Sequence, residues 1–206
     1  MTPNQELDWV LRAREGDQQA FAELVHAFQR PIYNLCYRML GSSGEAEDAT
    51  QEAFLRAYTK LETYDPNRKF SSWVLSIASH HCIDRLRKRR GDTVSMDELQ
   101  SWRWLPDDGV EPEQQALHDE GRHTVRTVLQ RLPPQYRLVI VLRYWQDLSY
   151  EEIAQVTDST QSAIKSRLHR ARQMMAKMIK EEPAMAHVLA GALPRRETQS
   201  ALSESF

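Results

Sequence analysis

A segment near the C-terminal end concentrates the side chains that suit contact with a nucleic acid. Residues 161–180 hold six Lys or Arg and no Asp or Glu. At 100° per residue on a helix, four apolar residues fall within about 60° of one another and predict a buried stripe; they are Ile164, Leu168, Ala171 and Met175. The opposite side carries Ser162, Ser166, His169, Arg170 and Gln173, flanked by Lys165, Arg167 and Arg172. In a DNA major groove, the middle of such a face reads base edges and its flanks neutralise phosphates.

The residues just upstream indicate how this helix is presented. Ser149-Tyr150-Glu151-Glu152 is a capping-box sequence, in which the Ser and the last Glu satisfy free amides at a helix start. A short apolar helix and a polar turn over 157–160 follow. A capped short helix, a four-residue turn and a basic helix together predict a helix-turn-helix. A basic helix found alone would more often be an ordinary solvated surface helix, so the turn and the cap decide between the two interpretations.

Charge is segregated along the chain although the net charge is only −2. Residues 85–90 hold five bases in six positions, and residues 92–113 hold seven acids against one Arg. Each block taken alone could be a solvated face. Together they indicate polyanion contacts separated by an extended, self-repelling connector, and residues 92–113 also carry Gly and Pro, as expected of an interdomain linker.

The remaining pattern is helical, and strand-like alternation is hard to find. Asp17 can cap a helix, Pro31 suits the first turn of a continuation, and Gly41 can end it. Further helices are expected over about 45–61, 70–90, 113–132 and 135–145. The third of the chain's helices carries a small face made of Ala46, Ala49, Ala53 and Ala57, which would allow close packing. We therefore predict an all-α fold.

The sequence lacks the motifs typical of disulfide-rich, metal-binding, catalytic and membrane proteins. Cys36 and Cys82 are the only cysteines, so neither a disulfide framework nor a zinc knuckle is indicated. His80, His81 and Cys82 are adjacent, but neighbouring side chains on a helix diverge by about 100°, which argues against a metal site. No phosphate loop, nucleophile elbow or paired-histidine zinc sequence is found, so we expect no cofactor, metal or catalytic residue. With no secretory signal and no apolar run of ~20 residues, we expect a cytoplasmic protein that does not enter a membrane.

At this point two blocks of residues resemble a known family. Leu132-Pro133, Glu151-Glu152-Ile153-Ala154 and the run from Lys165 to Arg172 resemble the C-terminal domain of extracytoplasmic-function (ECF) sigma factors. Upstream, the run from Glu45 to Phe54 resembles the polymerase-binding helix of that family. Phe70-Ser71-Ser72-Trp73 with Ile77-Ala78 and Asp84-Arg85-Leu86-Arg87 resembles its promoter-melting helix. The match covers roughly residues 17–90 and 114–178, in the order and spacing of the family.

The resemblance implies a role for the exposed side of the third helix. In the family this helix docks on the clamp helices of the large subunit of RNA polymerase, and the flap of the polymerase is a second expected contact. Asp48, Gln51, Glu52 and Leu55 lie away from the alanine face and form an acidic-polar patch with an apolar anchor. Without the family match, a plain solvated face would be a competing interpretation.

The resemblance also implies that the fourth helix and the loop before it hold the separated strand of the −10 promoter element. An opened strand is caught by a basic track together with surfaces for unstacked bases. The expected contacts are Tyr64, Asn67, Lys69, Phe70, Trp73, His80, Arg85, Arg87 and Lys88. Phe70 and Trp73, at i and i+3, are more often core residues than base-stacking ones, so Tyr64 and the loop are the stronger candidates.

The chain departs from the family pattern at a few positions. His80 stands where Asn is common, which puts the corresponding base contact in doubt. Asp158 stands where Gly is commonest, and Ser162-Ala163 replace the usual Gly-Thr. The turn is therefore expected to differ slightly, while the register of the recognition helix is kept.

The resemblance implies two small domains joined by an extended acidic linker. The expected boundaries are a sigma2-like bundle over 1–91, the linker over 92–113, a sigma4-like helix-turn-helix domain over 114–181 and a tail over 182–206. The implied function is promoter recognition at the −10 and −35 elements with core RNA polymerase, under control of an anti-sigma factor. A stand-alone regulator with a similar helix-turn-helix is the alternative, but residues 1–91 show no ligand or phospho-acceptor domain. An enzyme is the third interpretation.

Overall fold

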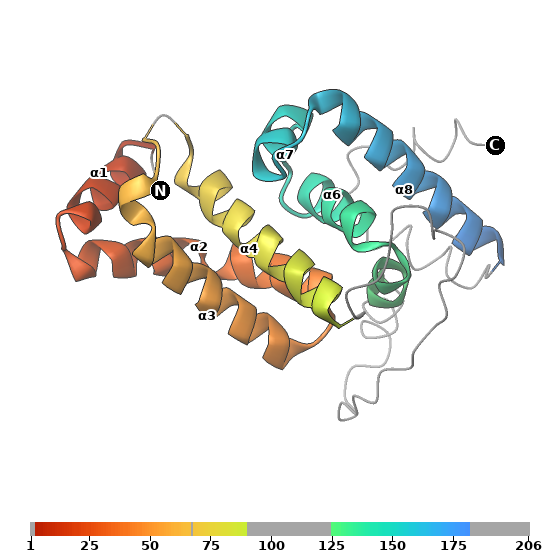
Figure 1. Ribbon diagram of the computed structural model, residues 1–206, viewed down its shortest axis with the longest axis horizontal. Helices are drawn as coiled ribbons and strands as arrows, with labels where there is room; N and C mark the ends of the chain where they lie inside the picture. The colour runs from red at the N-terminus through yellow and green to blue at the C-terminus, as the bar shows by residue number, and fades with distance from the viewer. Residues whose placement is uncertain (1–2, 67, 90–124, 182–206) are drawn as a thin grey trace.

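Two groups of helices lie side by side in the computed structural model, which describes residues 3–66, 68–89 and 125–181 (Figure 1). Within those residues the secondary structure is entirely helical, as the sequence predicts. The N-terminal bundle consists of α1 (Pro3–Arg14), α2 (Gln18–Leu40), α3 (Ser43–Thr59), the 3-10 turn η1 (Leu61–Thr63) and α4 (Phe70–Lys88). The C-terminal unit consists of helical residues 125–131, α6 (Pro134–Tyr144), α7 (Tyr150–Val156) and α8 (Gln161–Glu181). The expected linker and tail lie outside the described residues.

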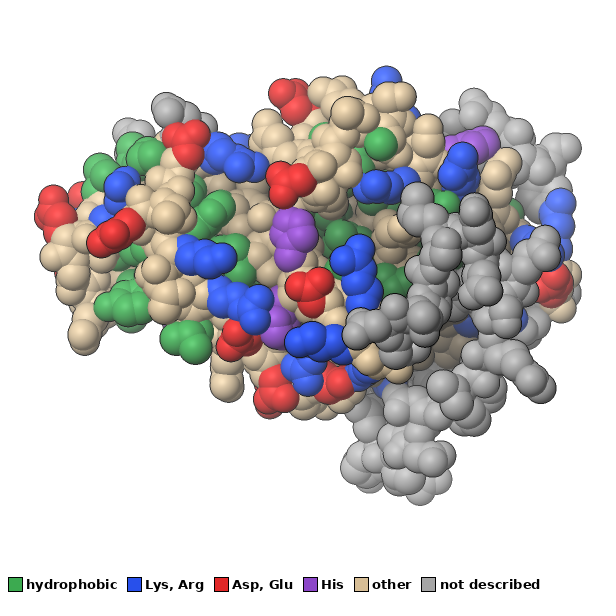
Figure 2. Space-filling model, in the orientation of Figure 1, with side chains coloured by type: hydrophobic (Ala, Val, Ile, Leu, Met, Phe, Trp, Pro, Cys, Tyr) green, Lys and Arg blue, Asp and Glu red, His purple; other side chains and the backbone are tan. Residues whose placement is uncertain are grey.

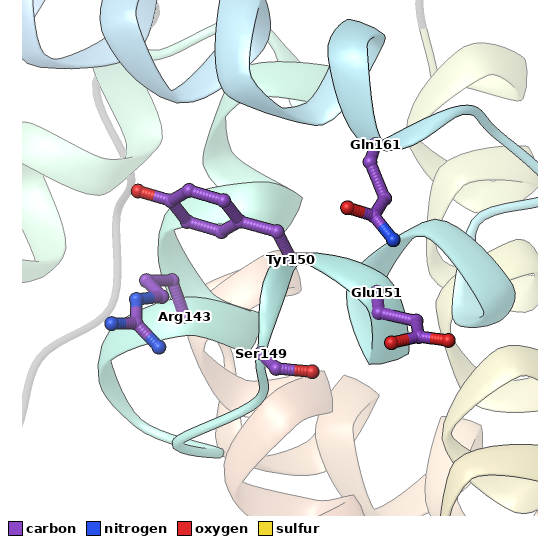
Figure 3. A pocket seen from close by; sticks show the side chains of 5 residues that line it. All are labelled: Arg143, Ser149, Tyr150, Glu151 and Gln161. Atoms are coloured by element: carbon purple, nitrogen blue, oxygen red, sulfur yellow. The ribbon is translucent and has the colours of Figure 1, made fainter.

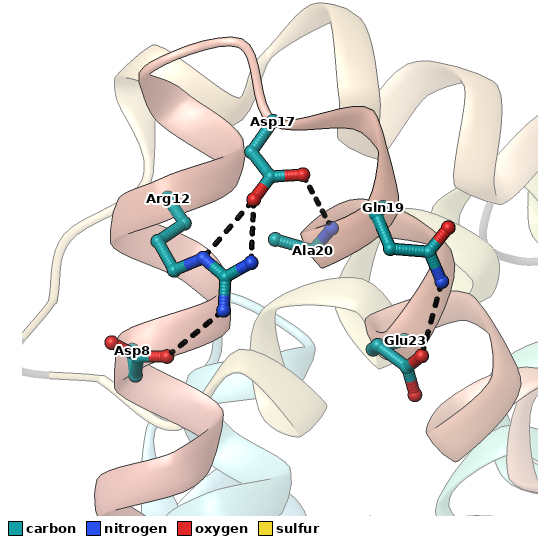
Figure 4. A network of polar contacts seen from close by, with 6 residues as sticks. All are labelled: Asp8, Arg12, Asp17, Gln19, Ala20 and Glu23. Carbon is teal, nitrogen blue, oxygen red and sulfur yellow. Dashed lines mark hydrogen bonds and ion pairs between the residues drawn. The ribbon is translucent and has the colours of Figure 1, made fainter.

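Asp17 begins α2 as predicted and also ties α1 to it (Figure 4). One carboxylate oxygen accepts from the Ala20 backbone N–H at 3.1 Å, and the other accepts from Arg12 Nη2 at 2.6 Å. The Ala20 amide first, and then Arg12, hold the pKa of Asp17 below its ordinary value. The helix before this junction, α1, is one that the sequence analysis did not predict.

Helix α2 runs unbroken through Pro31, whereas the sequence suggested a restart there. Proline lacks an N–H and disturbs one turn, but the apolar residues on both sides of it share one buried face, and their packing keeps the helix continuous. Gly41 ends α2 in the left-handed conformation (φ 85°), with its N–H donating to Tyr37 O at 2.8 Å. This is the C-terminal stop that the sequence predicts.

Helix α3 packs closely against α2 and α4 through its small face. Ala46, Ala49, Ala53 and Ala57 are all fully buried, so this prediction is confirmed. Because alanine adds almost no volume, the helix axes can approach one another. Phe54 is the one large apolar side chain of α3 that is also buried, while Leu55 and the charged side chains such as Asp48 lie toward the outer side.

The interior of the N-terminal bundle also holds both cysteines. Cys36 on α2 and Cys82 on α4 are fully buried thiols that form no disulfide. The hydrogen bond with Cys36, together with burial, raises the pKa of the Cys82 thiol well above its ordinary value.

The C-terminal unit is built on α6, which is apolar on nearly every side. Val139, Ile140, Val141 and Leu142 are almost completely buried, between α7, α8 and the N-terminal bundle. Arg137 on the same helix is also buried, and its Nη2 donates to Gln130 O at 2.7 Å and to Leu132 O at 3.2 Å. These two carbonyls end the preceding helix, so Arg137 supplies donors that a helix C-terminus lacks.

None of the described helices is both long enough and apolar enough to cross a lipid bilayer.

A substitution on each side of α3 tests its packing. Ala53→Leu forces three extra carbons into a closed interface and should destabilise the N-terminal bundle by about 1–3 kcal/mol. Leu55→Ala, two residues along on the exposed side, should change stability by less than about 0.5 kcal/mol. The measurement is the denaturant midpoint followed by circular dichroism. Equal shifts in the two variants would contradict the assigned faces.

Candidate nucleic-acid interface

The recognition helix α8 is divided into a buried and an exposed side as predicted. Ile164, Leu168, Ala171 and Met175 are at most 7% exposed and pack mainly against α6 and α7. The predicted groove-facing residues Ser162, Ser166, His169 and Arg170, and the flanking Lys165, are exposed. The helix therefore presents small polar groups and cations to the outside while its apolar stripe fixes its rotation.

The helix before it is held by the predicted capping box. Ser149 Oγ accepts from the Glu152 N–H at 3.2 Å, and Glu152 Oε2 accepts from the Ser149 N–H at 2.9 Å. The turn that follows contains Asp158 in the left-handed conformation, with φ 47°. Asp tolerates this region better than most residues, so the turn closes without the glycine that the family usually has.

Two of the predicted phosphate-contacting arginines are engaged within the unit. Arg167 Nη1 donates to Ser159 Oγ at 2.9 Å and so braces the turn. Arg172 is half-buried, and its Nε donates to Tyr144 Oη at 3.1 Å. The expectation that Arg172 reaches outward to a phosphate does not fit this position, because the Tyr144 hydroxyl draws its guanidinium back onto α6.

A hollow that the sequence analysis missed lies at the mouth of the helix-turn-helix (Figure 3). It is lined by Arg143, Ser149, Tyr150, Glu151 and Gln161, from α6, the start of α7 and the start of α8. The Arg143 guanidinium lies over the Tyr150 ring, 5.4 Å from its centroid, and Nη1 donates to Leu148 O at 3.0 Å. Arg143 is the last cation of α6, and its proximity to the turn follows only from the tertiary packing. The hollow therefore places one cation, Arg143, beside the Glu151 carboxylate and neutral polar side chains, next to the start of the recognition helix.

At the start of α4, two predicted base-stacking residues are packing residues instead. Phe70 is fully buried and Tyr64 is 5% exposed, and their ring centroids lie 5.7 Å apart. The Tyr64 hydroxyl donates to Arg68 O, and burial raises the pKa of Tyr64 to about 12. Tyr64 was the stronger sequence candidate, but in this structure its ring closes the end of the core and is not open to a base. Trp73 is half-buried against both rings, and Asn67 lies outside the described residues.

Two further predicted contacts, one just before α4 and one in its middle, are exposed. The Lys69 side chain is 71% exposed, and its Nζ lies 2.7 Å from Glu152 Oε1 in the C-terminal unit. His80 is 53% exposed, with Nε2 3.9 Å from Asp158 Oδ2. Both groups therefore face α7 and the turn after it.

The basic end of α4 lies beside the acidic start of α3. Arg85 Nη2 is 3.9 Å from both Glu45 Oε1 and Asp48 Oδ2, and Arg89 also contacts Glu45. Arg87 and Lys88 are exposed. Figure 2 shows Lys and Arg side chains interspersed with Asp and Glu across this face, so the basic run is partly balanced by its neighbours.

The predicted polymerase-facing residues on α3 form an open surface. Asp48 and Gln51 are exposed, Leu55 is 59% exposed, and Glu52 is half-buried with its Oε1 2.6 Å from Arg56 Nε. Leu55 is the most exposed large apolar side chain among the described residues. It stands among polar groups, as an apolar anchor for a partner would.

His80, His81 and Cys82 point in different directions, with His80 exposed and Cys82 buried. Across the described residues no three His, Cys, Asp or Glu side chains are grouped so that they could hold a metal ion.

The two parts of the chain match two models of one class of protein. Residues 24–91 match Sigma-70 region 2, and residues 122–175 match Sigma-70, region 4. The first match covers most of the N-terminal bundle, and the second covers the helix-turn-helix and the helices before it. The two matches, in this order along the chain, are those of a sigma factor.

Curated relatives narrow the class. The chain is 39% identical over 178 residues to the ECF RNA polymerase sigma factor SigW of Bacillus subtilis, covering 84% of this chain and 95% of that protein. It is 32% identical to the RNA polymerase sigma-H factor of Pseudomonas aeruginosa, covering 87% of this chain and 96% of that protein. It is also 32% identical to the ECF RNA polymerase sigma-E factor of Escherichia coli K12, with 80% and 88% covered. The chain belongs to the extracytoplasmic-function sigma factors of the sigma-70 family, which are transcription initiation factors and not enzymes.

Solved structures share the fold. CnrH in complex with the cytosolic domain of CnrY superposes with a TM-score of 0.65 at 22% identity, covering 86% of this chain and 99% of that chain. The sigma factor RpoE of Bartonella quintana, in complex with the anti-sigma factor NepR, gives 0.59 at 20% identity, with 79% and 98% covered.

The facing of α8 can be tested without DNA. Leu168→Ala removes a side chain that is 1% exposed and should destabilise the C-terminal unit by about 2–5 kcal/mol. His169→Ala, the next residue on the exposed side, should change stability by less than about 0.5 kcal/mol. Thermal unfolding of both variants measures this difference, and a larger loss for His169→Ala would mean that the helix is rotated.

Proposed function

We propose that this chain binds core RNA polymerase through α3, holds the opened −10 strand with α4 and reads the −35 element with α8. The observation that carries the proposal is the exposed polar and basic face of α8, set by a buried stripe in a capped helix-turn-helix. It occurs in a chain whose other half matches region 2. A stand-alone regulator would not carry that half.

The polymerase contact is proposed for Asp48, Gln51, Glu52 and Leu55. They lie on the side of α3 opposite the buried alanines, so a partner can reach them without disturbing the core. An acidic rim around an apolar anchor suits a basic partner surface, for which the clamp helices of the polymerase are the proposed candidate.

The proposed −10 surface is smaller than the sequence implied. Tyr64 and Phe70 are withdrawn from it because their rings are buried. Lys69, Trp73, His80, Arg87 and Lys88 remain, with Arg85 shared between the strand and the acids of α3. A basic track beside one half-buried aromatic ring supports capture of an unstacked strand.

The proposed −35 surface is Ser162, Lys165, Ser166, His169 and Arg170 on α8, with the hollow beside Arg143 added for the DNA backbone. The Arg guanidinium forms paired hydrogen bonds with the edge of guanine, and the Ser hydroxyl can hydrogen-bond to any of the bases. Arg167 and Arg172 brace the unit behind this surface.

Two further parts of the proposal concern regulation and place of action. We propose control by an anti-sigma factor, supported by the shared fold with a sigma factor solved in complex with one. We propose that the chain acts in the cytoplasm, where polymerase and promoter DNA are present. The test of the whole proposal is transcription in vitro: the chain added to core polymerase should give promoter-dependent transcripts that core alone does not.

Charge reversal on α3 tests the polymerase surface. Asp48→Lys with Glu52→Lys should weaken binding to core polymerase by about tenfold or more, equivalent to about 1.4 kcal/mol. The fold should persist, because exposed ion pairs contribute about 0–1 kcal/mol. The measurement is a binding titration with labelled protein. The control, Glu15→Lys with Glu23→Lys, makes the same change in net charge away from α3, and an equal loss in both would argue against the assigned face.

Two substitutions on α8 separate base reading from phosphate contact. Arg170→Ala should reduce selectivity at one or two base pairs of the −35 element, since an Arg–guanine pair is worth roughly 1–3 kcal/mol. Lys165→Ala should weaken binding evenly across sequences and lower the salt dependence by about one charge. Binding to a panel of single-base −35 variants at two salt concentrations measures both effects. If Lys165→Ala alters base preference and Arg170→Ala does not, the register is wrong.

A further inference from the structure

Helix α4 begins at the proposed −10 surface without a capping side chain of its own. Lys69 is the residue before the helix, with extended backbone (φ −63°, ψ 130°), and its side chain makes no capping hydrogen bond. Lysine carries donors only, whereas Ser, Thr, Asp or Asn would normally accept from the first amides at this position. The free amides at the start of α4 therefore need an acceptor from elsewhere in the chain.

That acceptor comes from the first turn of α1. Glu6 Oε1 accepts from the Phe70 N–H at 2.8 Å, across 64 positions of sequence. Glu6 is half-buried and Phe70 is fully buried, so the bond is partly shielded from water. A carboxylate also suits this place electrostatically, because the start of a helix carries partial positive charge.

Helix α1 also contacts the other end of the segment that joins α3 to α4. Arg14 Nη2 donates to Glu62 O of η1 at 3.3 Å, and α1 packs against η1. Figure 1 shows α1 beside this segment. Glu6 and Arg14 lie near opposite ends of the same helix. A single rigid element therefore holds both η1 and the start of α4.

The charge of Glu6 also acts on the ring that closes this end of the core. Burial first, and then the negative charge of Glu6, raise the pKa of Tyr64 to about 12. The Tyr64 hydroxyl therefore stays a donor, and it donates to Arg68 O. The backbone that leads into α4 is thus held on both sides of Lys69, by Tyr64 before it and by Glu6 after it.

Two of the residues proposed to hold the −10 strand are placed by this junction. Lys69 directly precedes the bonded Phe70 amide. Trp73 lies one turn further along, where its N–H donates to Lys69 O at 3.2 Å and its ring packs against Phe70. The match to Sigma-70 region 2 begins at residue 24, so Glu6 lies outside it.

We propose that Glu6 is a positioning residue for the −10 surface: its carboxylate caps α4 and fixes the first turn, from which Lys69 and Trp73 meet the unpaired strand. Glu6 acts through the Phe70 amide and does not itself touch the DNA. Without the acceptor the first turn frays toward water, and both side chains lose their fixed geometry. This inference rests on the proposed −10 surface.

Three substitutions at Glu6 separate the acceptor from the charge. Glu6→Gln keeps an acceptor oxygen at the same reach and loses the charge. Glu6→Met is of similar length and loses both. Glu6→Asp keeps the charge but shortens the side chain by one methylene, which withdraws the carboxylate from the Phe70 amide. Glu6→Asp also carries the test if Glu6→Met does not fold.

A fourth variant, Ile32→Val, is the control for a loss of stability alone. Ile32 is fully buried in the same bundle. Removing one methylene from the core costs about as much as removing one helix cap, so Ile32→Val and Glu6→Met should each lower the Tm by about 2–8 °C.

Promoter opening is measured with each full-length variant bound to core polymerase, on a promoter from which the parent chain gives transcripts and well below the Tm. Permanganate modification of unpaired thymines around the −10 element reports the opening. At equal polymerase occupancy, Glu6→Met and Glu6→Asp should reduce opening by about threefold to tenfold, as expected for the loss of one cap. Glu6→Gln and Ile32→Val should stay within about twofold of the parent.

Equal opening by Glu6→Met and Glu6→Gln would overturn the proposal, because the acceptor would then have no part in it. A loss in Ile32→Val as large as that in Glu6→Met would reduce Glu6 to a stability residue. Increased opening by both neutral variants would show a charge that repels DNA, which also rejects the positioning role. If the parent opens the promoter and no variant differs from it, only this inference fails. If the parent does not open any promoter, the proposed function fails.

Discussion

The absence of side-chain volume on one face of α3 is the constraint on which the N-terminal bundle depends. Four buried alanines let α3 lie close to both α2 and α4. Apart from the buried Phe54, the large side chains of α3 are displaced toward the outer face, where Asp48 and Leu55 lie. The same close approach brings the acids at the start of α3 within reach of Arg85 and Arg89 on α4. A packing requirement thus fixes both the open acidic surface and the partial neutralisation of the basic run beside it.

In the C-terminal unit, apolar packing fixes the rotation of α8. Helix α8 must present cations outward while its rotation stays fixed, and a continuous apolar stripe against α6 and α7 supplies the fixed rotation. The supporting polar bonds are internal: Arg167 braces Ser159, and Arg172 binds Tyr144. Some of the positive charge of α8 therefore stabilises the unit itself, and fewer cations face outward than the sequence count of Lys and Arg implies.

The features predicted well from sequence are those set by local periodicity and by caps. The stripe through Ile164 and Leu168, the capping box at Ser149 and the stop at Gly41 are each encoded within a few residues, and all are confirmed. Roles that depend on distant packing were predicted less well. The sequence places Tyr64 in a polar loop, where its ring would be open to a base. In the structure, Phe70 and Trp73 of α4 pack against that ring. Arg143 joins a hollow only after α6, α7 and α8 have assembled. The contact between Lys69 and Glu152 spans 83 positions and leaves no local signal.

The two buried thiols give the molecule an internal reporter of its own motion. Cys36 and Cys82 sit on different helices in the core of the N-terminal bundle, and neither is accessible to a reagent in the folded chain. Modification of either one must wait for α2 and α4 to separate locally. Its rate under native conditions therefore measures the free energy of that opening, in the same way as amide exchange does. Because the native thiols are shielded, a cysteine introduced on the surface can be labelled first. The slower modification of Cys36 and Cys82 can then be followed separately in the same molecule.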